Sequence, residues 1–263
     1  MAPASTSNRS IGIVSGRGGV GKSILAVNLG AVLTKRGVKN IIIDADISNP
    51  SIGLHLGLPY SPTGLQDVLL EHKHFRDAIL AHPSTGMRVL PASLKYTRGV
   101  TLRNLARVVN EVGKAYEFTI VDSPPGLTED VLHIVDACDE IVVVTTPDVP
   151  GVSSATKIIA LCRAGKKTVR GIVVNRCTGA PFELTVREIE SMADAPVLVR
   201  ILEDRTIPAS ISTRVPAVYY ALDSPASRKL GEFALSFVET GKHELGRPGL
   251  IMRLVSWVKG IFS

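Results

Sequence analysis

The chain has 263 residues, 45% of them hydrophobic, and a formal net charge of +6 at pH 7. This length allows one α/β domain with a large core and leaves no room for two large domains. The positive net charge favours binding to anionic surfaces, but it does not indicate whether such a surface would be lipid or nucleic acid.

The cysteines favour buried thiols over disulfides or metal ligands. Cys138, Cys162 and Cys177 are odd in number, widely spaced and set in apolar segments, and the chain has no C-x-x-C pair. Residues 1–9 lack the apolar core and basic flank of a secretory signal. We expect a disordered tail there, and a protein that stays in the cytoplasm.

The first element carries a complete G-x-x-x-x-G-K-[ST] phosphate loop. It follows the apolar run 11–14 and opens the apolar segment 24–33, the strand-loop-helix context that the motif requires. Its glycines allow backbone N–H groups to point inward, and the following helix adds the positive end of its dipole. The predicted nucleotide contacts are Gly16, Arg17, Gly18, Gly19, Val20, Gly21, Lys22, Ser23 and Ile24.

Lys22 is expected to reach the β- and γ-phosphates, and the Ser23 hydroxyl to ligate Mg²⁺. The sequence therefore predicts binding of ATP and Mg²⁺. The alternative is a glycine-rich turn with a solvated Arg17, which the context of the motif disfavours.

Short apolar runs alternate with amphipathic stretches along the rest of the chain. The runs rich in Val and Ile indicate strands buried on both faces, and so an α/β fold with helices on both sides of a mostly parallel sheet. Ligands then bind beyond the carboxyl ends of the strands. The predicted strands are 11–14, 40–44, 87–90, 118–122, 140–145, 170–175 and 196–199.

Two of these strands end in carboxylates. Asp122 begins an Asp-Ser-Pro-Pro-Gly segment, from which it would hold Mg²⁺ directly or through water, with the Gly126 amide near the γ-phosphate. The alternative is that Asp122 caps the helix starting near Thr128. Asp44 and Asp46 face one direction if the extended conformation persists. We predict a metal group of Ser23, Asp44, Asp46 and Asp122, with Asp46 orienting the attacking water; the alternative for Asp44 and Asp46 is ordinary turn residues.

These motifs resemble the MinD/ParA family of deviant Walker ATPases, and the MinD branch most closely. Gly18–Ser23, Asp44–Asp46 and Asp122–Gly126 match the family's motifs in order, and Thr145–Asp148 resembles a later segment. The resemblance implies a three-layer P-loop NTPase fold and a slow, partner-stimulated ATPase that forms a homodimer with ATP. Arg17 stands where the family has a signature lysine that reaches the partner's phosphates, so it is expected to be catalytic together with Lys22 and Asp46; a merely solvated Arg17 stays open.

The resemblance also places Asn175, Arg176, Glu203 and Asp204 near adenine. From the residues alone, Asn175 as a strand cap and Glu203-Asp204 as a solvated turn remain equally open.

Residues 241–249 contain three glycines and a proline and are predicted to be a linker between the ATPase domain, 10–240, and a terminal helix, 250–263. At about 100° per residue this helix is amphipathic, and it is shorter than the roughly 20 residues of a membrane span. The resemblance implies membrane targeting, and docking on protein is the alternative. The apolar face holds Leu250, Ile251, Leu254, Val255, Trp257, Val258, Ile261 and Phe262.

Together these features predict an ATP-dependent switch that cycles between the cytosol and the anionic inner face of the membrane. By resemblance it would position the division site or another structure and respond to an unidentified activating protein. A rival is a ParA-like partition protein that binds DNA through Arg163, Lys166, Lys167 and Arg170, a cluster better explained as a solvated helix end. An iron–sulfur carrier is disfavoured by the missing paired thiols, and nucleic acid is not an expected partner.

Overall fold

A computed structural model describes residues 8–95, 97 and 99–240. Within these residues the strands form one eight-stranded sheet in the order β3-β4-β2-β5-β1-β6-β7-β8. All neighbours are parallel except β3, which is antiparallel to β4 at the edge. The strands are β1 Arg9–Val14, β2 Asn40–Asp44, β3 Leu80–Ala81, β4 Arg88–Leu90, β5 Phe118–Asp122, β6 Glu140–Thr145, β7 Thr168–Cys177 and β8 Val197–Leu202.

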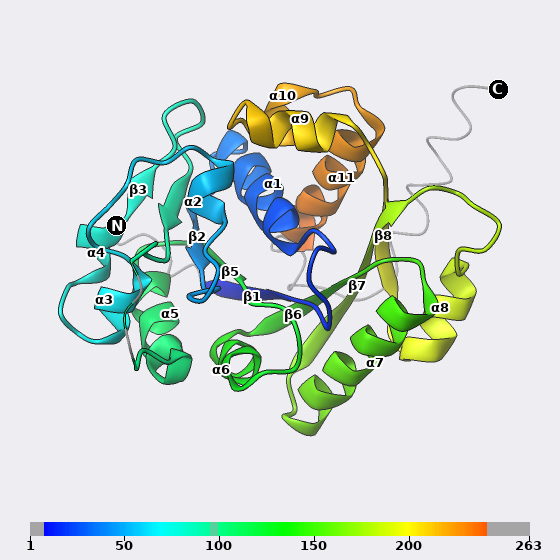
Figure 1. Ribbon diagram of the computed structural model, residues 1–263, viewed down its shortest axis with the longest axis horizontal. Coiled ribbons are helices and arrows are strands. Elements are labelled where there is room, and N and C mark those ends of the chain that lie inside the picture. The colour runs from blue at the N-terminus through cyan, green and yellow to red at the C-terminus, as the bar shows by residue number, and fades with distance from the viewer. Residues whose placement is uncertain (1–7, 96, 98, 241–263) are drawn as a thin grey trace.

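Helices cover both faces of this sheet. Figure 1 shows α1, α9, α10 and α11 over one face and α5 to α8 over the other. The helices are α1 Lys22–Lys35, α2 Ile52–His55, α3 Leu65–Leu69, α4 Phe75–Ala78, α5 Leu105–Gly113, α6 Glu129–Ala137, α7 Val149–Ala164, α8 Val186–Ala193, α9 Thr206–Ser212, α10 Ala217–Tyr220 and α11 Pro225–Thr240, with a 3₁₀ turn, η1, at Leu102–Asn104.

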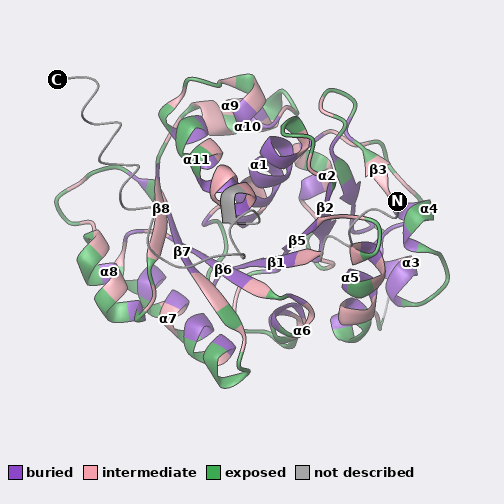
Figure 2. Cartoon of the chain, turned by 180° about the vertical axis from the view of Figure 1, so that it is seen from behind, coloured by how far each residue is buried: buried purple, intermediate pink, exposed green. Residues whose placement is uncertain are grey.

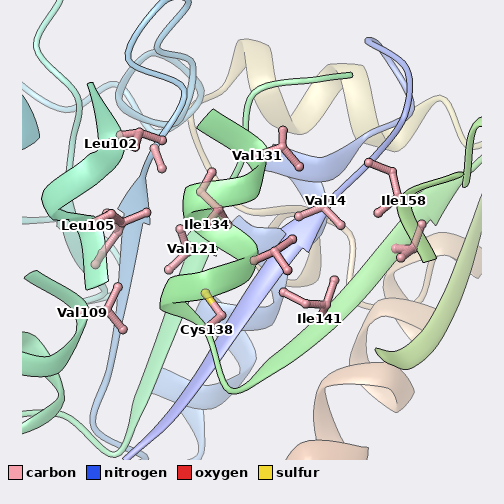
Figure 3. Close-up of a cluster of buried hydrophobic side chains, with 14 of the residues drawn as sticks. Val14, Leu102, Leu105, Val109, Val121, Val131, Ile134, Cys138, Ile141 and Ile158 are labelled. Carbon is pink, nitrogen blue, oxygen red and sulfur yellow. The ribbon is translucent and has the colours of Figure 1, made fainter. Parts of the chain in front are cut away.

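The period-two alternation of each strand divides the core into two layers. On β2, Ile41 and Ile43 belong to the layer that includes buried residues of α5 to α8, whereas Ile42 belongs to the layer that includes α1 and α11. The central strands between these two layers are largely buried, as Figure 2 shows. Figure 3 shows the layer under α5, α6 and α7, where Val14, Val121 and Ile141 meet side chains from the helices.

The predicted α/β fold with a mostly parallel sheet is confirmed. The short edge strand β3 was not predicted, because two residues give too little periodicity to recognise. The predicted disordered residues 1–9 lie largely outside the described part, and so do the linker 241–249 and the helix 250–263. In the part of the chain that the structure covers, none of the helices has the length and apolarity needed to cross a membrane.

Two arginines hold the end of α11 at the amino edge of the sheet. Arg9 donates to the Phe237 carbonyl at 3.1 Å and Arg170 to the Ser236 carbonyl at 3.2 Å. Both pair with Glu140, at 2.7 and 3.0 Å, and Arg170 stacks 4.2 Å from the Phe237 ring centre. The cations thus satisfy carbonyls at a helix C-terminus, where positive charge is favourable.

Candidate nucleotide site

The phosphate loop joins β1 to α1, and close packing requires glycine at two of its positions. A Cβ on Gly16 would lie 2.6 Å from the Cβ of Ser154 on α7. Gly21 has φ +99°, and a Cβ there would lie 2.2 Å from Nδ2 of Asn175. The loop is therefore pressed between α7 and the end of β7, with its backbone turned inward.

Asn175 and Arg176, neighbouring residues near the end of β7, both reach this loop. The Asn175 side chain donates to the Val20 carbonyl at 2.7 Å, and Arg176 lies 3.5 Å from the Gly19 carbonyl. Arg176 also pairs with Glu203 at 2.9 Å. The sequence placed these residues at one edge of the sheet, and the structure brings them together with the loop.

Lys22 lies in a buried cluster of charges. Its side chain is at the start of α1, and the residue is 7% exposed. Burial lowers the pKa of Lys22, while the nearby carboxylates of Asp122 and Asp46 act in the opposite direction. A third carboxylate, that of Asp44, lies beside Asp122 in the β2–β5 register. The site therefore has excess negative charge that a bound cation would neutralise.

The Asp122 carboxylate is buried without a hydrogen-bond partner among the described residues. The residue is 1% exposed, and both of its oxygens lack such a partner. Burial raises the pKa of Asp122 to about 7, against the lowering effects of the Ser23 hydroxyl and Lys22 nearby. An unpartnered buried carboxylate beside a hydroxyl is the donor set that Mg²⁺ prefers, so these residues fit the metal. Asp122 does not cap α6, because Thr128 accepts from Val131 there.

Asp44, a predicted metal ligand, accepts hydrogen bonds from backbone amides of the loop that follows β2. Strand β2 ends at Asp44, so Asp46 lies in the loop that follows it. One Asp44 oxygen accepts from the Ser51 and Ile52 amides, both at 3.1 Å, and the other lies 3.3 Å from the Asp46 amide. Burial, followed by the charge of Asp122, raises the pKa of Asp44 well above its ordinary value. Asp44 therefore helps to hold the loop after β2 through these amides.

Asp46 is half-buried and holds the same loop through the Asn49 amide at 3.0 Å. Burial raises its pKa above the ordinary value, although the Asn49 amide and Lys22 oppose this. The Asp46 carboxylate is close enough to Lys22 for the two charges to interact. This position is compatible with the predicted contact to a water molecule.

Sequence reasoning missed Ser51. Its hydroxyl donates to the Ser23 hydroxyl at 3.0 Å, which joins the loop after β2 to the proposed metal ligand. The signal was present, because serine immediately before a helix is usually an N-cap. Here, however, the side chain makes no capping bond to α2.

Arg17 is paired and not simply solvated. It donates to Asp148 at 2.8 Å, and both side chains are 46% exposed. Asp148 also accepts from the Gly151 amide at 2.8 Å, as the N-cap of α7, and from the Thr146 hydroxyl. Burial raises the pKa of Asp148, but the bonds from Thr146, Gly151 and Arg17 outweigh it and leave the pKa below its ordinary value.

The Gly126 amide is also engaged. It donates to the Ser15 carbonyl at 2.9 Å, so it does not stand free for a phosphate in this conformation. Gly126 has φ +95°, which lets the segment after Asp122 turn back onto the phosphate loop.

Beside the loop is a cavity of about 340 Å³. It is bounded by Gly19 and Gly21 on one side and is mostly apolar; other lining residues include Ile24, Val173, Asn175, Arg176, Ile201, Glu203, Asp204, Ile207 and Pro208. This volume and lining suit a flat heterocycle. Asp204 lines it, but its two oxygens accept from Thr206 and from the Ala226 amide, so it acts chiefly as a structural group.

Comparison with known proteins identifies the family of this chain. A family model described as ParA, NUBPL iron-transfer P-loop NTPase, matches residues 6–183, more than half of the chain. An uncharacterized ATP-binding protein of Methanocaldococcus jannaschii is 33% identical over 96% of both chains. The chain belongs to the MinD/ParA family of P-loop ATPases.

Relatives in this family include proteins named for septum-site determination. A MinD of Thermotoga maritima is 32% identical over 57% of this chain and 56% of its own. The solved structure of the septum site-determining protein MinD of Pyrococcus horikoshii, complexed with Mg-ADP, has a TM-score of 0.84 and 25% identity, covering 89% of this chain and 97% of that one.

Two other predicted features of this MinD/ParA ATPase can now be compared with the structure. Arg163 pairs with Asp194 at 2.7 Å, Lys167 donates to the Asp136 carbonyl at 2.6 Å, and Arg170 is bound to Glu140. Most of the basic cluster is thus used within the chain, which weakens the case for DNA binding. The three cysteines are buried, and burial raises the pKa of each thiol, so they are poor thiolate ligands.

Proposed function

We propose that the protein is an ATP-hydrolysing switch of the MinD type, which pairs with a second copy when it holds ATP and Mg²⁺. The observation that carries this proposal is the buried, unpartnered Asp122 carboxylate beside Ser23 and Lys22 at the phosphate loop. In this proposal Ser23 and Asp122 hold Mg²⁺, which would neutralise charge on the phosphates.

Other residues of the chain bind the nucleotide, orient the attacking water and contact the second copy. The phosphate-loop amides and Lys22 bind the phosphates, and the apolar cavity beside Asn175 holds adenine. Asp46 orients the attacking water, since positioning and charge neutralisation are the main needs of phosphoryl transfer. Arg17 leaves Asp148 and reaches the phosphates of the second copy, where a guanidinium fork suits their oxygens.

The exposed apolar side chains support pairing at the nucleotide face. Leu54, Leu94, Leu127 and Val149 are between 48% and 60% exposed, and they follow β2, β4, β5 and β6 at the carboxyl edge of the sheet. Large apolar residues gathered around one site are typical of a protein interface. A second copy would cover them and also bring its Arg17 to this edge.

The output we propose is reversible binding to the anionic inner face of the membrane through residues 250–263, with a cytosolic form after hydrolysis. Two tails on one dimer would gain roughly 10²–10⁴ in avidity over one. An unidentified protein would stimulate hydrolysis, and the cycle would serve to position the division site or another structure.

Calorimetry with Mg·ADP tests the nucleotide site first. Lys22→Ala should abolish binding, whereas Lys35→Ala, at the far end of α1, should bind like the wild type. Absence of heat with the wild-type chain would reject the proposal at its base.

Liposome co-sedimentation then tests the switch. Vesicles containing anionic lipid are mixed with ATP, ADP or no nucleotide, using the full chain and a chain ending at Gly246. We expect pelleting that needs both ATP and the tail. Equal pelleting in every nucleotide state would leave a lipid anchor but reject the switch.

A further inference from the structure

Phe182 is the most exposed of the large apolar side chains in the described residues, at 85%. It lies in the loop between β7 and α8, and hydrogen bonds hold this loop in place. Glu183 accepts from the Thr178 amide at 2.6 Å and from its hydroxyl at 2.8 Å, and the Leu184 amide donates to the Pro147 carbonyl at 2.9 Å. An aromatic side chain that a fixed loop presents to water is typical of an interface anchor.

A groove of about 260 Å³ opens beside α2, at the same carboxyl edge of the sheet. A Cβ on Gly53, in its wall, would meet no atom within 4 Å, so the groove is open on that side. Because a cavity of about 150 Å³ already holds a benzene ring, this groove has room for a benzyl side chain. Its large apolar lining residues are Leu54, Leu58, Pro59, Tyr60, Pro91 and Leu94.

The Phe182 loop and this groove lie on opposite sides of the phosphate loop at similar distances from it. The phosphate loop follows β1; β7 is two places from β1 in the sheet, and β2 and β4, which lead to the groove, are two and three places away on the other side. At about 4.8 Å per strand, the offsets are about 10 Å and about 10–14 Å. Figure 1 shows α8 and α2 on opposite sides of the start of α1.

We propose that, in the pair formed with ATP, Phe182 of each copy enters the groove beside α2 of the other copy. This inference rests on the proposed function, which pairs two copies at the nucleotide face. Two identical copies that meet in a closed pair are related by a two-fold axis, which lies in their interface. An axis perpendicular to the sheet and beside the phosphate loop brings the β7 side of one copy over the β2–β4 side of the other, so the pair contains the contact twice.

The exposed apolar area supports a second copy as the occupant of the groove. Phe182 is 85% exposed and Tyr60, at the groove, is 66% exposed. Since a Phe or Tyr side chain buries about 150–250 Å², these two residues of both copies would supply roughly 600 Å². This is more than half of the roughly 1,000 Å² that a specific interface requires.

Sedimentation equilibrium of the full chain with ATP and Mg²⁺ is the first test. Phe182→Ala should weaken dimerisation by about a hundredfold, because truncating an anchor costs about tenfold or more and the pair contains two such anchors. Phe182→Leu keeps an apolar side chain and should recover most of this affinity. Leu222→Ala, at a residue 56% exposed in a separate groove beside α1 and α11, is the matched control and should pair like the wild type.

Disulfide cross-linking tests the orientation of the pair. The native cysteines are buried, so Phe182→Cys and Leu94→Cys each add an exposed thiol to the described part of the chain. With ATP, Mg²⁺ and a copper oxidant, a mixture of the two single variants should give a cross-linked dimer, and neither variant should do so alone. Cross-linking of Phe182→Cys with itself would place like loops together and overturn the proposal.

The remaining outcomes separate this inference from the proposed function. A wild type that pairs with ATP while Phe182→Ala pairs equally well would overturn the role of Phe182 and leave the switch intact. A Leu94→Cys thiol that resists alkylation in the nucleotide-free monomer would show that another part of the chain covers the groove, and would overturn it in the same way. A wild type that binds Mg·ADP by calorimetry but stays monomeric with ATP would overturn both.

Discussion

Asp148 accepts from Arg17 of the phosphate loop and, with the same Oδ1, from the amide of Gly151 at the start of α7. The residue that would reach a second copy is therefore held against its own subunit in this conformation. Pairing through Arg17 must break this contact, so the contact opposes dimer formation by a small amount, since an exposed ion pair contributes about 0–1 kcal/mol.

Asp148→Asn should increase dimer formation. Asparagine keeps an oxygen to cap α7 but removes the charge that holds Arg17. We expect about two- to fivefold tighter dimerisation with ATP and Mg²⁺, measured by sedimentation equilibrium. Arg17→Ala is the opposing variant and should lose ATP hydrolysis; dimerisation unchanged in Asp148→Asn would contradict this role of the contact.

Asp122 should make the metal-free protein less stable as pH rises. Its folded pKa of about 7 lies above the ordinary value of 3.8, so between these values the folded state binds more protons than the unfolded state. The stabilisation present at low pH is lost as the pH approaches and passes 7. Asp122→Asn removes this titration and should be about 2–4 kcal/mol more stable than the wild type at pH 8.

Urea unfolding in EDTA between pH 5 and pH 8 measures this difference. A slope remains in the variant because Asp44 shifts in the same direction. Asp223→Asn, whose side chain is 96% exposed, is the control and should follow the wild type. A variant with the full wild-type slope would show that Asp122 does not titrate in this window.

Asn175→Ala should weaken nucleotide binding by about tenfold. The change removes the bond to the Val20 carbonyl and one polar group of the cavity, and each such bond contributes about 1 kcal/mol. Calorimetry with Mg·ADP measures the effect, and Asn110→Ala on α5 is the control. An affinity within twofold of the wild type would exclude this cavity as the nucleotide base site.

Glu140→Ala should destabilise the fold by about 2–3 kcal/mol and loosen the end of α11. It leaves two largely buried arginines without their shared carboxylate. Urea unfolding gives the free energy, and hydrogen exchange in α11 gives the location. Glu232→Ala, which loses only an exposed pair with Lys229, should change stability by less than about 0.5 kcal/mol; similar losses in both variants would refute the special role of Glu140.

The fold followed from sequence because its signals are local. The Val- and Ile-rich runs identify β2, β5, β6 and β7, and the phosphate-loop motif fixes the connection from β1 to α1. The helix start near Thr128 was also predictable, since the Thr128 hydroxyl accepts a hydrogen bond from the amide only three residues along the chain.

The sequence predicted which residues gather at the candidate site, but not which residues each of them contacts. Arg17 and Asp148 are 131 positions apart and meet only because β1 and β6 are neighbours in the sheet. The role of Asp44 depended on where β2 ends, which sets whether its oxygens meet backbone amides or open space. The partner of Ser51 was likewise not predictable, because its hydroxyl bonds to Ser23, 28 positions away, and not to the adjacent helix.

Strands β1, β6 and β7 begin at the cluster that holds α11 and end at the loops around the proposed phosphates. The end of α11, the last described helix, therefore lies at the pole opposite the proposed nucleotide site. A bilayer bound at that pole would leave the other one open, so adsorption and pairing would not compete for the same surface. Two subunits could meet while both remain attached.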